Sequence, residues 1–156
     1  MAGRSYETDV SIPMGNGVEA PIYRAKDVKY TVGLQDGSQH ILRNFQDGDM
    51  GTITKDEAKI TGINDPQGSP GAVENASSLG KGVNTLMWGS PSCKLLIQLY
   101  NSGEYFSYHK QDGEEYVGGD HCFISEAPEI GNGKDFPTRQ FTIVILDYDL
   151  QNVDDM

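Results

Sequence analysis

Apolar and polar residues alternate over short stretches of the chain, which is the pattern of strands with one buried face. The clearest early example is 28–32, Val-Lys-Tyr-Thr-Val, and the pair Asp36-Gly37 that follows is typical of a tight hairpin turn. This turn predicts that 40–45 returns as the second strand of a hairpin. Further strands are expected over 50–54, 58–63, 83–88, 104–110, 114–117, 121–127 and 139–148.

One segment departs from the strand pattern and predicts a helix over 90–100. Ser90 can cap a helix and Pro91 suits the first helical position. Leu96, Leu99 and Tyr100 have the i, i+3, i+4 spacing of one helical face, and the Asn-Ser-Gly at 101–103 is suited to ending the helix. A strand through this segment is the alternative, and the two end signals favour the helix.

Two glycines and the last strand carry further local predictions. Gly118-Gly119 interrupts a strand region and predicts a break or β-bulge there. In 139–148, apolar residues occupy both alternating sets of positions, so both faces of this strand are expected to be covered.

The segment 64–82 differs from the rest, because it has no apolar periodicity and contains four Gly and two Pro. We expect a long loop without regular structure, a feature that is usually functional or disordered in a compact domain. In an oligomer, its natural use is contact with another subunit. The flanking organisation is an N-terminal arm over 1–20, one β-rich domain over 21–149, and an acidic tail over 150–156.

Composition restricts the function further. The 156 residues suit one domain, and 19 Gly with 7 Pro fit a chain rich in turns. The 23 acidic residues outnumber the 12 basic ones, giving a net charge of −11, and no Lys/Arg cluster is present. This excludes a protein that grips nucleic-acid phosphates, and solubility alone is another interpretation of the charge.

The cysteines and the ends of the chain bear on its location. Cys93 and Cys122 form no Cys-x-x-Cys motif, so we expect two buried thiols rather than a disulfide framework. The first ten residues have no apolar signal region, and the longest apolar run, 141–146, is too short to span a bilayer. A cytosolic product is therefore expected.

No motif in the chain predicts an enzyme, a metal site or a cofactor. Gly80-Lys81-Gly82 has part of a phosphate-loop pattern, but Asn75 stands at the position of the first Gly. His121 and Cys122 are adjacent, so in a strand they point to opposite faces and cannot easily share a metal.

The order of elements over 83–148 is more specific than any single motif. A strand and a short helix lead to Asn101-Ser102-Gly103; an aromatic strand follows, then an Asp112-Gly113 turn. A strand with Gly118-Gly119 and Phe123, a Pro-containing loop and a long last strand complete the order. This order resembles the lambda-type major tail proteins of bacteriophages and the tube proteins of contractile tails. The resemblance is good over 83–148 and holds only in outline before it, while the acidic tail has no clear counterpart.

The resemblance implies a mainly β fold, a β-sandwich with one short flanking helix and a long inter-strand loop. It implies hexameric rings that stack into a hollow tail tube for DNA passage, located in the virion after synthesis in the host cytoplasm. The partners would be further copies of the chain and other tail proteins, such as a sheath, terminator, baseplate or tip. DNA would pass without tight binding, and no membrane would be involved. The inter-ring contact loop would include Asp65, Gly68, Gly71, Glu74 and Asn75.

A tube for DNA should have a wall that does not bind phosphates. We therefore expect a negative lumen, with Asp36, Asp47, Asp49, Asp56 and Glu57 as candidate lining residues. The alternatives are another virion β-sandwich protein (a tail terminator, neck or head-decoration protein) and a soluble β-sandwich module that binds sugar or peptide. Trp88, Tyr105, Tyr108 and Tyr116 could be the exposed aromatic residues of such a module, although Trp88 and Tyr105 suit a core equally well.

Overall fold

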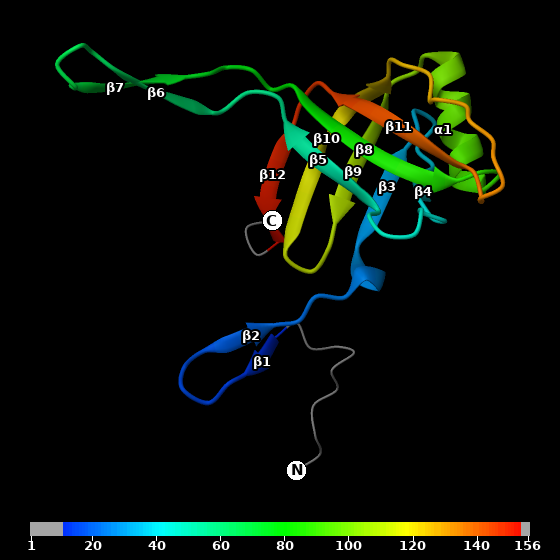
Figure 1. Ribbon diagram of the computed structural model, residues 1–156, viewed down its shortest axis with the longest axis horizontal. Helices are drawn as coiled ribbons and strands as arrows, with labels where there is room; N and C mark the ends of the chain where they lie inside the picture. The colour runs from blue at the N-terminus through cyan, green and yellow to red at the C-terminus, as the bar shows by residue number, and fades with distance from the viewer. Residues whose placement is uncertain (1–10, 154–156) are drawn as a thin grey trace.

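The computed structural model describes residues 11–153 and is a mainly β structure, a β-sandwich with one α-helix (Figure 1). Its main sheet has eight strands in the order β4-β3-β9-β10-β11-β8-β5, with β12 beside β10. All strand pairs are antiparallel. The elements of the body are β3 Lys29–Gly33, β4 Gln39–Ile41, β5 Gly51–Lys55, β8 Gly80–Met87, α1 Pro91–Ser102, β9 Phe106–Gln111, β10 Glu115–Ile124, β11 Thr138–Ile145 and β12 Asp149–Asn152.

Two separate hairpins extend away from this body (Figure 1). One pairs β1 (Ser11–Pro13) with β2 (Glu19–Pro21), and a short 3-10 helix at Ala25–Asp27 lies between it and the body. The other pairs β6 (Ile60–Asn64) with β7 (Pro70–Glu74) and is inserted between β5 and β8.

The main sheet curls so that strands distant in its order face each other. The hydroxyl of Tyr108 in β9 donates a hydrogen bond to the side-chain oxygen of Asn84 in β8, although β10 and β11 lie between these strands in the sheet. Gly82 makes this approach possible, because a Cβ atom there would lie 2.6 Å from Cε1 of Tyr108. Phe45, between β4 and β5, forms an isolated bridge with Leu86.

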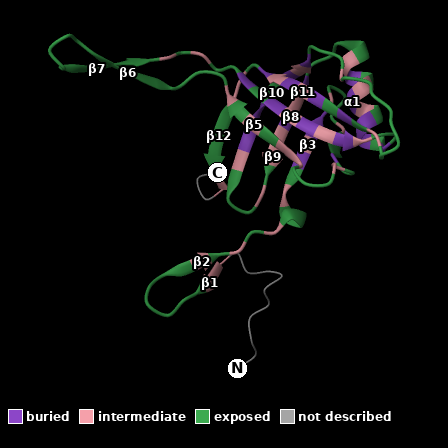
Figure 2. Cartoon of the chain, viewed as in Figure 1, coloured by how far each residue is buried: buried purple, intermediate pink, exposed green. Residues whose placement is uncertain are grey.

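The hydrophobic core fills the space between the two halves of the sheet and the helix (Figure 2). Tyr30 and Phe106 contribute from one half, Phe141 and Ile143 from the other, and Leu96 from α1. Both cysteines are buried free thiols, as predicted. Trp88 and Tyr105, which could have been core residues, are instead 57% and 52% exposed.

The predicted helix and its two end signals are confirmed. The Ser90 Oγ accepts a hydrogen bond from the backbone N–H of Cys93 at 3.2 Å, and Pro91 is the first helical residue. Gly103 ends the helix with φ of 72°, a conformation that favours glycine. The helix lies against β10 and β8 and buries Cys93, Leu96 and Leu99 there.

The bulge predicted at Gly118-Gly119 is present, but it lies directly after this pair, at 120–121. The register between β10 and β9 shifts between Gly119 and Cys122. Gly118 has φ of 148°, and a Cβ atom there would collide with the backbone carbonyl of Tyr108. Only glycine fits this position without displacing the neighbouring strand.

Other predictions from the sequence need correction. The segment 64–82 is not structureless, because it contains the end of β6, the whole of β7 and the start of β8. The strand predicted over 139–148 is β11, and only one of its faces is fully covered: positions 139, 141, 143 and 145 are buried, whereas 138 and 140 are exposed and 142 and 144 are partly covered. Residues 149–152 are exposed as predicted, but they form a strand paired with β10 rather than part of an unpaired tail, and 154–156 of the predicted tail lie outside the described residues.

Candidate assembly surface

The hairpin β6–β7 exposes both of its faces and both of its outer edges. Every residue of both strands is exposed, and in Figure 2 the hairpin stands clear of the body. Thr61 pairs with Val73, and Ile63 pairs with Gly71, so these four residues share one face. Ile63 is 55% exposed and Val73 is 48% exposed. A two-stranded hairpin of this kind is only marginally stable in water, so this face is suited to covering by a partner.

The tip of this hairpin is nevertheless well ordered by its own hydrogen bonds. The Asp65 carboxylate accepts hydrogen bonds from the backbone N–H groups of Gln67 at 2.9 Å and Ser69 at 2.8 Å. Gly68 has φ of 86°, and its N–H donates to the Asp65 carbonyl at 3.0 Å. The Gly and Pro residues that suggested an irregular loop therefore build a compact turn, and Pro70 begins an unpaired edge where no N–H is needed.

The structure places all five predicted inter-ring contact residues on this hairpin or at its base. Asp65 and Gly68 form the tip, Gly71 and Glu74 lie in β7, and Asn75 lies at the base. The Asn75 side chain donates to the Ala58 carbonyl at 2.6 Å and so ties the two strands together where they leave the body. Asp65 and Asn75 thus hold the hairpin's shape, which leaves its exposed apolar and acidic side chains for a partner.

The hairpin β1–β2 is a second projection, which sequence reasoning described only as part of an arm. Its strands are held by backbone pairing of Ile12 with Ala20 and by a hydrogen bond from the Ser11 hydroxyl to Glu19 at 3.0 Å. Met14 and Val18 are 59% and 55% exposed at its turn. The Gly-Asn-Gly turn at 15–17 was the available signal, because both glycines adopt positive φ.

The structure does not bring the five candidate lumen residues into one cluster. Asp36 lies in the turn after β3, where the Ser38 hydroxyl donates to its carboxylate at 2.6 Å. Asp47 and Asp49 precede β5, whereas Asp56 and Glu57 follow it, so these two pairs lie at opposite ends of one strand. All five are exposed. Any shared surface of these carboxylates would therefore have to come from several copies of the chain.

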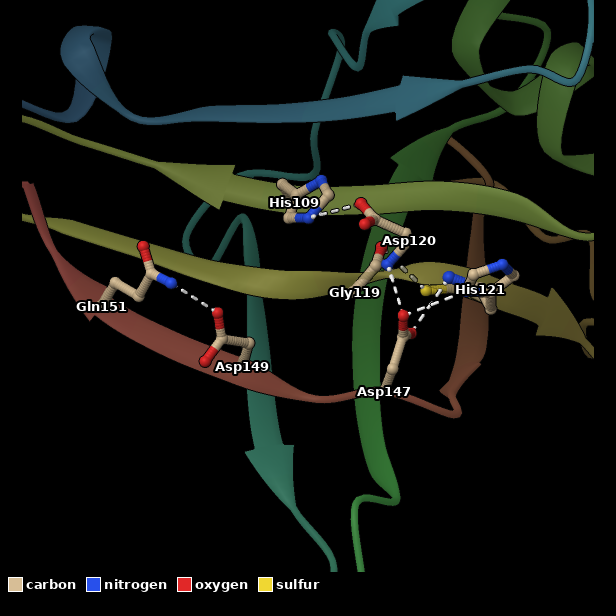
Figure 3. Close-up of polar contacts among 8 residues, drawn as sticks. His109, Gly119, Asp120, His121, Asp147, Asp149 and Gln151 are labelled. Carbon is tan, nitrogen blue, oxygen red and sulfur yellow. Dashed lines mark hydrogen bonds and ion pairs between the residues drawn. The ribbon is translucent and has the colours of Figure 1, made fainter. Parts of the chain in front are cut away.

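A polar cluster surrounds the bulge in β10 (Figure 3). The Asp147 carboxylate accepts hydrogen bonds from the backbone N–H groups of Asp120 at 3.2 Å and His121 at 3.0 Å. It also lies 3.0 Å from Nδ1 of His121. Partial burial alone would raise the pKa of Asp147, but these hydrogen bonds outweigh it and the pKa is lowered. Asp147 therefore satisfies backbone donors that the bulge leaves without strand partners.

The second histidine of this cluster is packed rather than poised for proton transfer. His109 stacks on Tyr116 with ring centroids 4.7 Å apart, and its Nε2 lies 3.5 Å from Asp120. Burial lowers its pKa despite the opposing effect of Asp120. The ring of His121 instead lies tilted against Tyr105, with ring centroids 5.5 Å apart, so the two histidines do not converge on a common point. The cluster stabilises the junction of β9, β10 and β12.

The described residues contain no arrangement typical of metal or thiol chemistry. Across residues 11–153, no group of three or more His, Cys, Asp or Glu side chains could hold a metal ion. Burial raises the pKa of the Cys122 thiol to about 12, so this sulfur is not a nucleophile at neutral pH. Within the same residues, no helix is both long and apolar enough to cross a bilayer.

Comparison with known proteins gives similarity in structure but not in sequence. No protein-family model matches the chain, and no curated protein is similar to it. A chain from the tail of an empty gene transfer agent particle with C6 symmetry has a TM-score of 0.61 and 10% identity, covering 85% of this chain and 99% of that one.

Two further solved structures are similar over most of their length. A chain of the anti-feeding prophage cap, a tube-terminating cap, has a TM-score of 0.58 and 10% identity, covering 91% of this chain and 100% of that one. A chain of the SPP1 tail tube has a TM-score of 0.59 and 16% identity, covering 83% of this chain and 78% of that one. At such low identities, these comparisons show that this chain shares the fold of those proteins.

Proposed function

We propose that this chain is a non-enzymatic structural subunit of a phage-like tail, in which hexameric rings stack into a hollow tube for DNA. It would be made in the host cytoplasm and would reside in the virion tail. The observation that carries the proposal is the fold, which matches a tail chain of a C6-symmetric particle over 99% of that chain's length.

The two projecting hairpins support assembly as the use of this fold. A hairpin whose apolar side chains are uncovered gains stability when another subunit covers them. A contact between a projection on one copy and a different surface on the next is heterologous, and repetition of such a contact produces open stacks. The contact residues proposed for stacking are the hairpin residues Asp65, Gly68, Gly71, Glu74 and Asn75.

The acidic charge supports DNA passage rather than DNA binding. A chain with net charge −11 and exposed carboxylates at both ends of β5 offers few sites for phosphate contacts. Each Lys or Arg contact to phosphate would add affinity through counterion release and would slow transit. We propose a net negative lumen to which Asp36, Asp47, Asp49, Asp56 and Glu57 contribute. Sheath, baseplate or tip proteins would be further partners of the tube.

Electron microscopy of the purified protein at high concentration tests the proposal directly. We expect rings with six-fold symmetry and, at higher concentration, stacked tubes with an open lumen. Duplex DNA should not be retained by these tubes at physiological salt. Monomers at every concentration tested, without rings, would contradict the proposal.

A tube terminator is the second candidate, and the likeness to the anti-feeding prophage cap favours it specifically. A terminator closes one end of a tube, so it would form single rings that do not extend into filaments. The same micrographs distinguish the two roles: long tubes support a tube subunit, whereas rings that bind only the end of a preformed tube support a terminator.

A further inference from the structure

A groove of about 600 Å³ lies between β4 and α1. Its charged lining residues are Arg43 and Lys94, His40 adds an imidazole ring, and Ile41 and Leu95 provide apolar surface. No acidic residue lines it, although acidic residues outnumber basic ones 23 to 12 in the chain. The groove is therefore a local exception to the acidic character of the molecule.

One side of this groove is the unpaired edge of a strand. β4 is the first strand of the sheet, with β3 on its inner side. Leu42 donates its N–H to Tyr30 at 2.8 Å, so the alternate residues Gln39 and Ile41 direct their backbone groups away from β3. The next outward N–H, that of Arg43, is already bonded to the Ser92 hydroxyl of α1 at 2.8 Å. Two residues of β4 thus offer donors and acceptors to an added strand.

We propose that this groove receives the hairpin β6–β7 of a second copy of the chain, with β7 added as a strand beside β4. This rests on the proposed function, since it assigns the surface that each hairpin contacts during stacking. Strand addition to an open sheet edge supplies main-chain hydrogen bonds, while the groove selects the side chains.

The charges of the hairpin and the groove are complementary. The segment 56–75 has one basic residue, Lys59, against four acidic ones, Asp56, Glu57, Asp65 and Glu74. The groove has the opposite balance, so the pair attracts each other and a reversed orientation is disfavoured. The other hairpin, β1–β2, fits less well, because its described strands have three residues each, with a proline in both, and only one carboxylate.

The free edge of β7 matches the free edge of β4 in length. Asn75 donates its N–H to the Lys59 carbonyl at 2.8 Å, which places the alternate residues of β7, Gly71 and Val73, on the inner side of the hairpin. Ala72 and Glu74 therefore direct their backbone groups outward. The outward backbone groups of two residues on β7 can therefore pair with those of two residues on β4.

The hairpin cannot reach the groove of its own chain. It leaves the body at the end where β5 finishes and β8 begins, whereas α1 follows the other end of β8 (Figure 1). The donor and acceptor surfaces consequently lie at opposite ends of the long axis. This arrangement suits a head-to-tail contact that repeats from copy to copy.

A crosslinking experiment tests the contact. Protein carrying Ile41→Cys is mixed with protein carrying Ala72→Cys and treated with a short bis-maleimide, while the native thiols are buried. We expect a crosslinked heterodimer, and no crosslink when Phe136→Cys, which is 66% exposed, replaces Ile41→Cys as the control. Assembled protein that crosslinks at Phe136→Cys but not at Ile41→Cys would overturn the inference.

A charge-swap experiment tests the recognition independently. Arg43→Glu with Lys94→Glu should weaken stacking by about 100-fold or more, measured as the protein concentration at which tubes form. Adding Gln67→Lys with Glu74→Lys to the same chain, which leaves the Asp65 hydrogen bonds of the turn intact, should restore tube formation to within about 10-fold of the wild type, because the attraction is re-established with reversed signs. The inference would be overturned if the groove variant formed tubes as readily as the wild type. It would also be overturned if the hairpin substitutions did not restore tube formation, while circular dichroism showed that each variant remains folded.

The two proposals can fail separately in these experiments. Tubes that form without the contact between Ile41→Cys and Ala72→Cys would leave the proposed function standing and remove the groove as the stacking surface. Crosslinked pairs that never close into six-fold rings would support the groove and contradict the hexameric tube.

Discussion

Replacing Ile63 and Val73 together by threonine should prevent tube stacking while leaving the folded subunit intact. Both side chains lie on the same face of the hairpin β6–β7 and are 55% and 48% exposed. Threonine retains the β-branched shape and strand preference of the originals, so the hairpin itself should persist. What changes is the gain in free energy when another copy covers that face.

The magnitude follows from the exposed fractions. Full burial of an Ile or Val side chain is worth about 1.5–3 kcal/mol, so covering the roughly half that is still exposed is worth about 1 kcal/mol each. One hairpin would thus lose about 2 kcal/mol, and a ring-to-ring contact with six hairpins about 12 kcal/mol. Substitutions at exposed sites usually change the stability of a single subunit by less than about 0.5 kcal/mol.

Sedimentation and electron microscopy of the double variant, beside thermal unfolding, check both halves of this reasoning. We expect rings or single subunits in place of tubes, with an unfolding temperature close to that of the wild type. Ile60→Thr is the matched control, because Ile60 is 60% exposed on the opposite face of the same hairpin and should cause a smaller loss. Normal tubes from the double variant would refute the role of this apolar face.

Three further predictions concern the body of the fold. Gly118→Ala should lower the unfolding free energy by about 3 kcal/mol or more, since its Cβ would collide with the Tyr108 carbonyl. Gly62→Ala is the control and should cost about 1 kcal/mol or less, because Gly62 has open space around it. Similar shifts in the unfolding temperature of the two variants would contradict the close approach of the backbones at Gly118. Tyr108→Phe should cost about 1–3 kcal/mol in urea unfolding, because it leaves the buried Asn84 oxygen without its donor, and an unchanged midpoint would refute this. Asp147→Asn should lower the unfolding free energy by about 1 kcal/mol at neutral pH. The pKa of Asp147 is lowered in the fold, so its contribution to stability is present above the unfolded pKa and is lost as pH falls through the folded pKa. The unfolding free energies of variant and wild type should therefore converge in acid.

The elements that sequence reasoning located well are those whose signals are local. Ser90, Pro91 and Gly103 fix the helix ends through hydrogen bonds within a few residues, which is why the pattern predicts them without knowledge of the rest. Gly118, which precedes the bulge, is a local signal of the same kind, because it has a conformation that only glycine adopts easily. The partner that satisfies the bulge, Asp147, is distant in sequence, and nothing local indicates that its carboxylate accepts those backbone N–H groups.

The strand β7 was missed for the opposite reason, although its partner β6 lies where a strand was predicted over 58–63. Strand prediction depends on alternation between a buried and a solvent-exposed face, but here both faces are exposed. The burial of β11 was predicted on both faces because its outward positions carry apolar residues, such as Val144, but these are only partly covered. In both cases, the pattern of apolar residues does not match the solvent exposure of the single chain.

This mismatch is itself informative about function. Only 37% of the residues are hydrophobic, yet Ile60, Ile63 and Val73 lie on a projection that contributes nothing to the core. A protein acting alone would gain by making these positions polar, since exposed apolar side chains promote aggregation without stabilising its fold. A subunit that completes its packing in an assembly needs them, and it also needs an edge and a groove that receive them. The exposure that conceals β7 in the sequence pattern is therefore what we expect of a chain that assembles with further copies of itself.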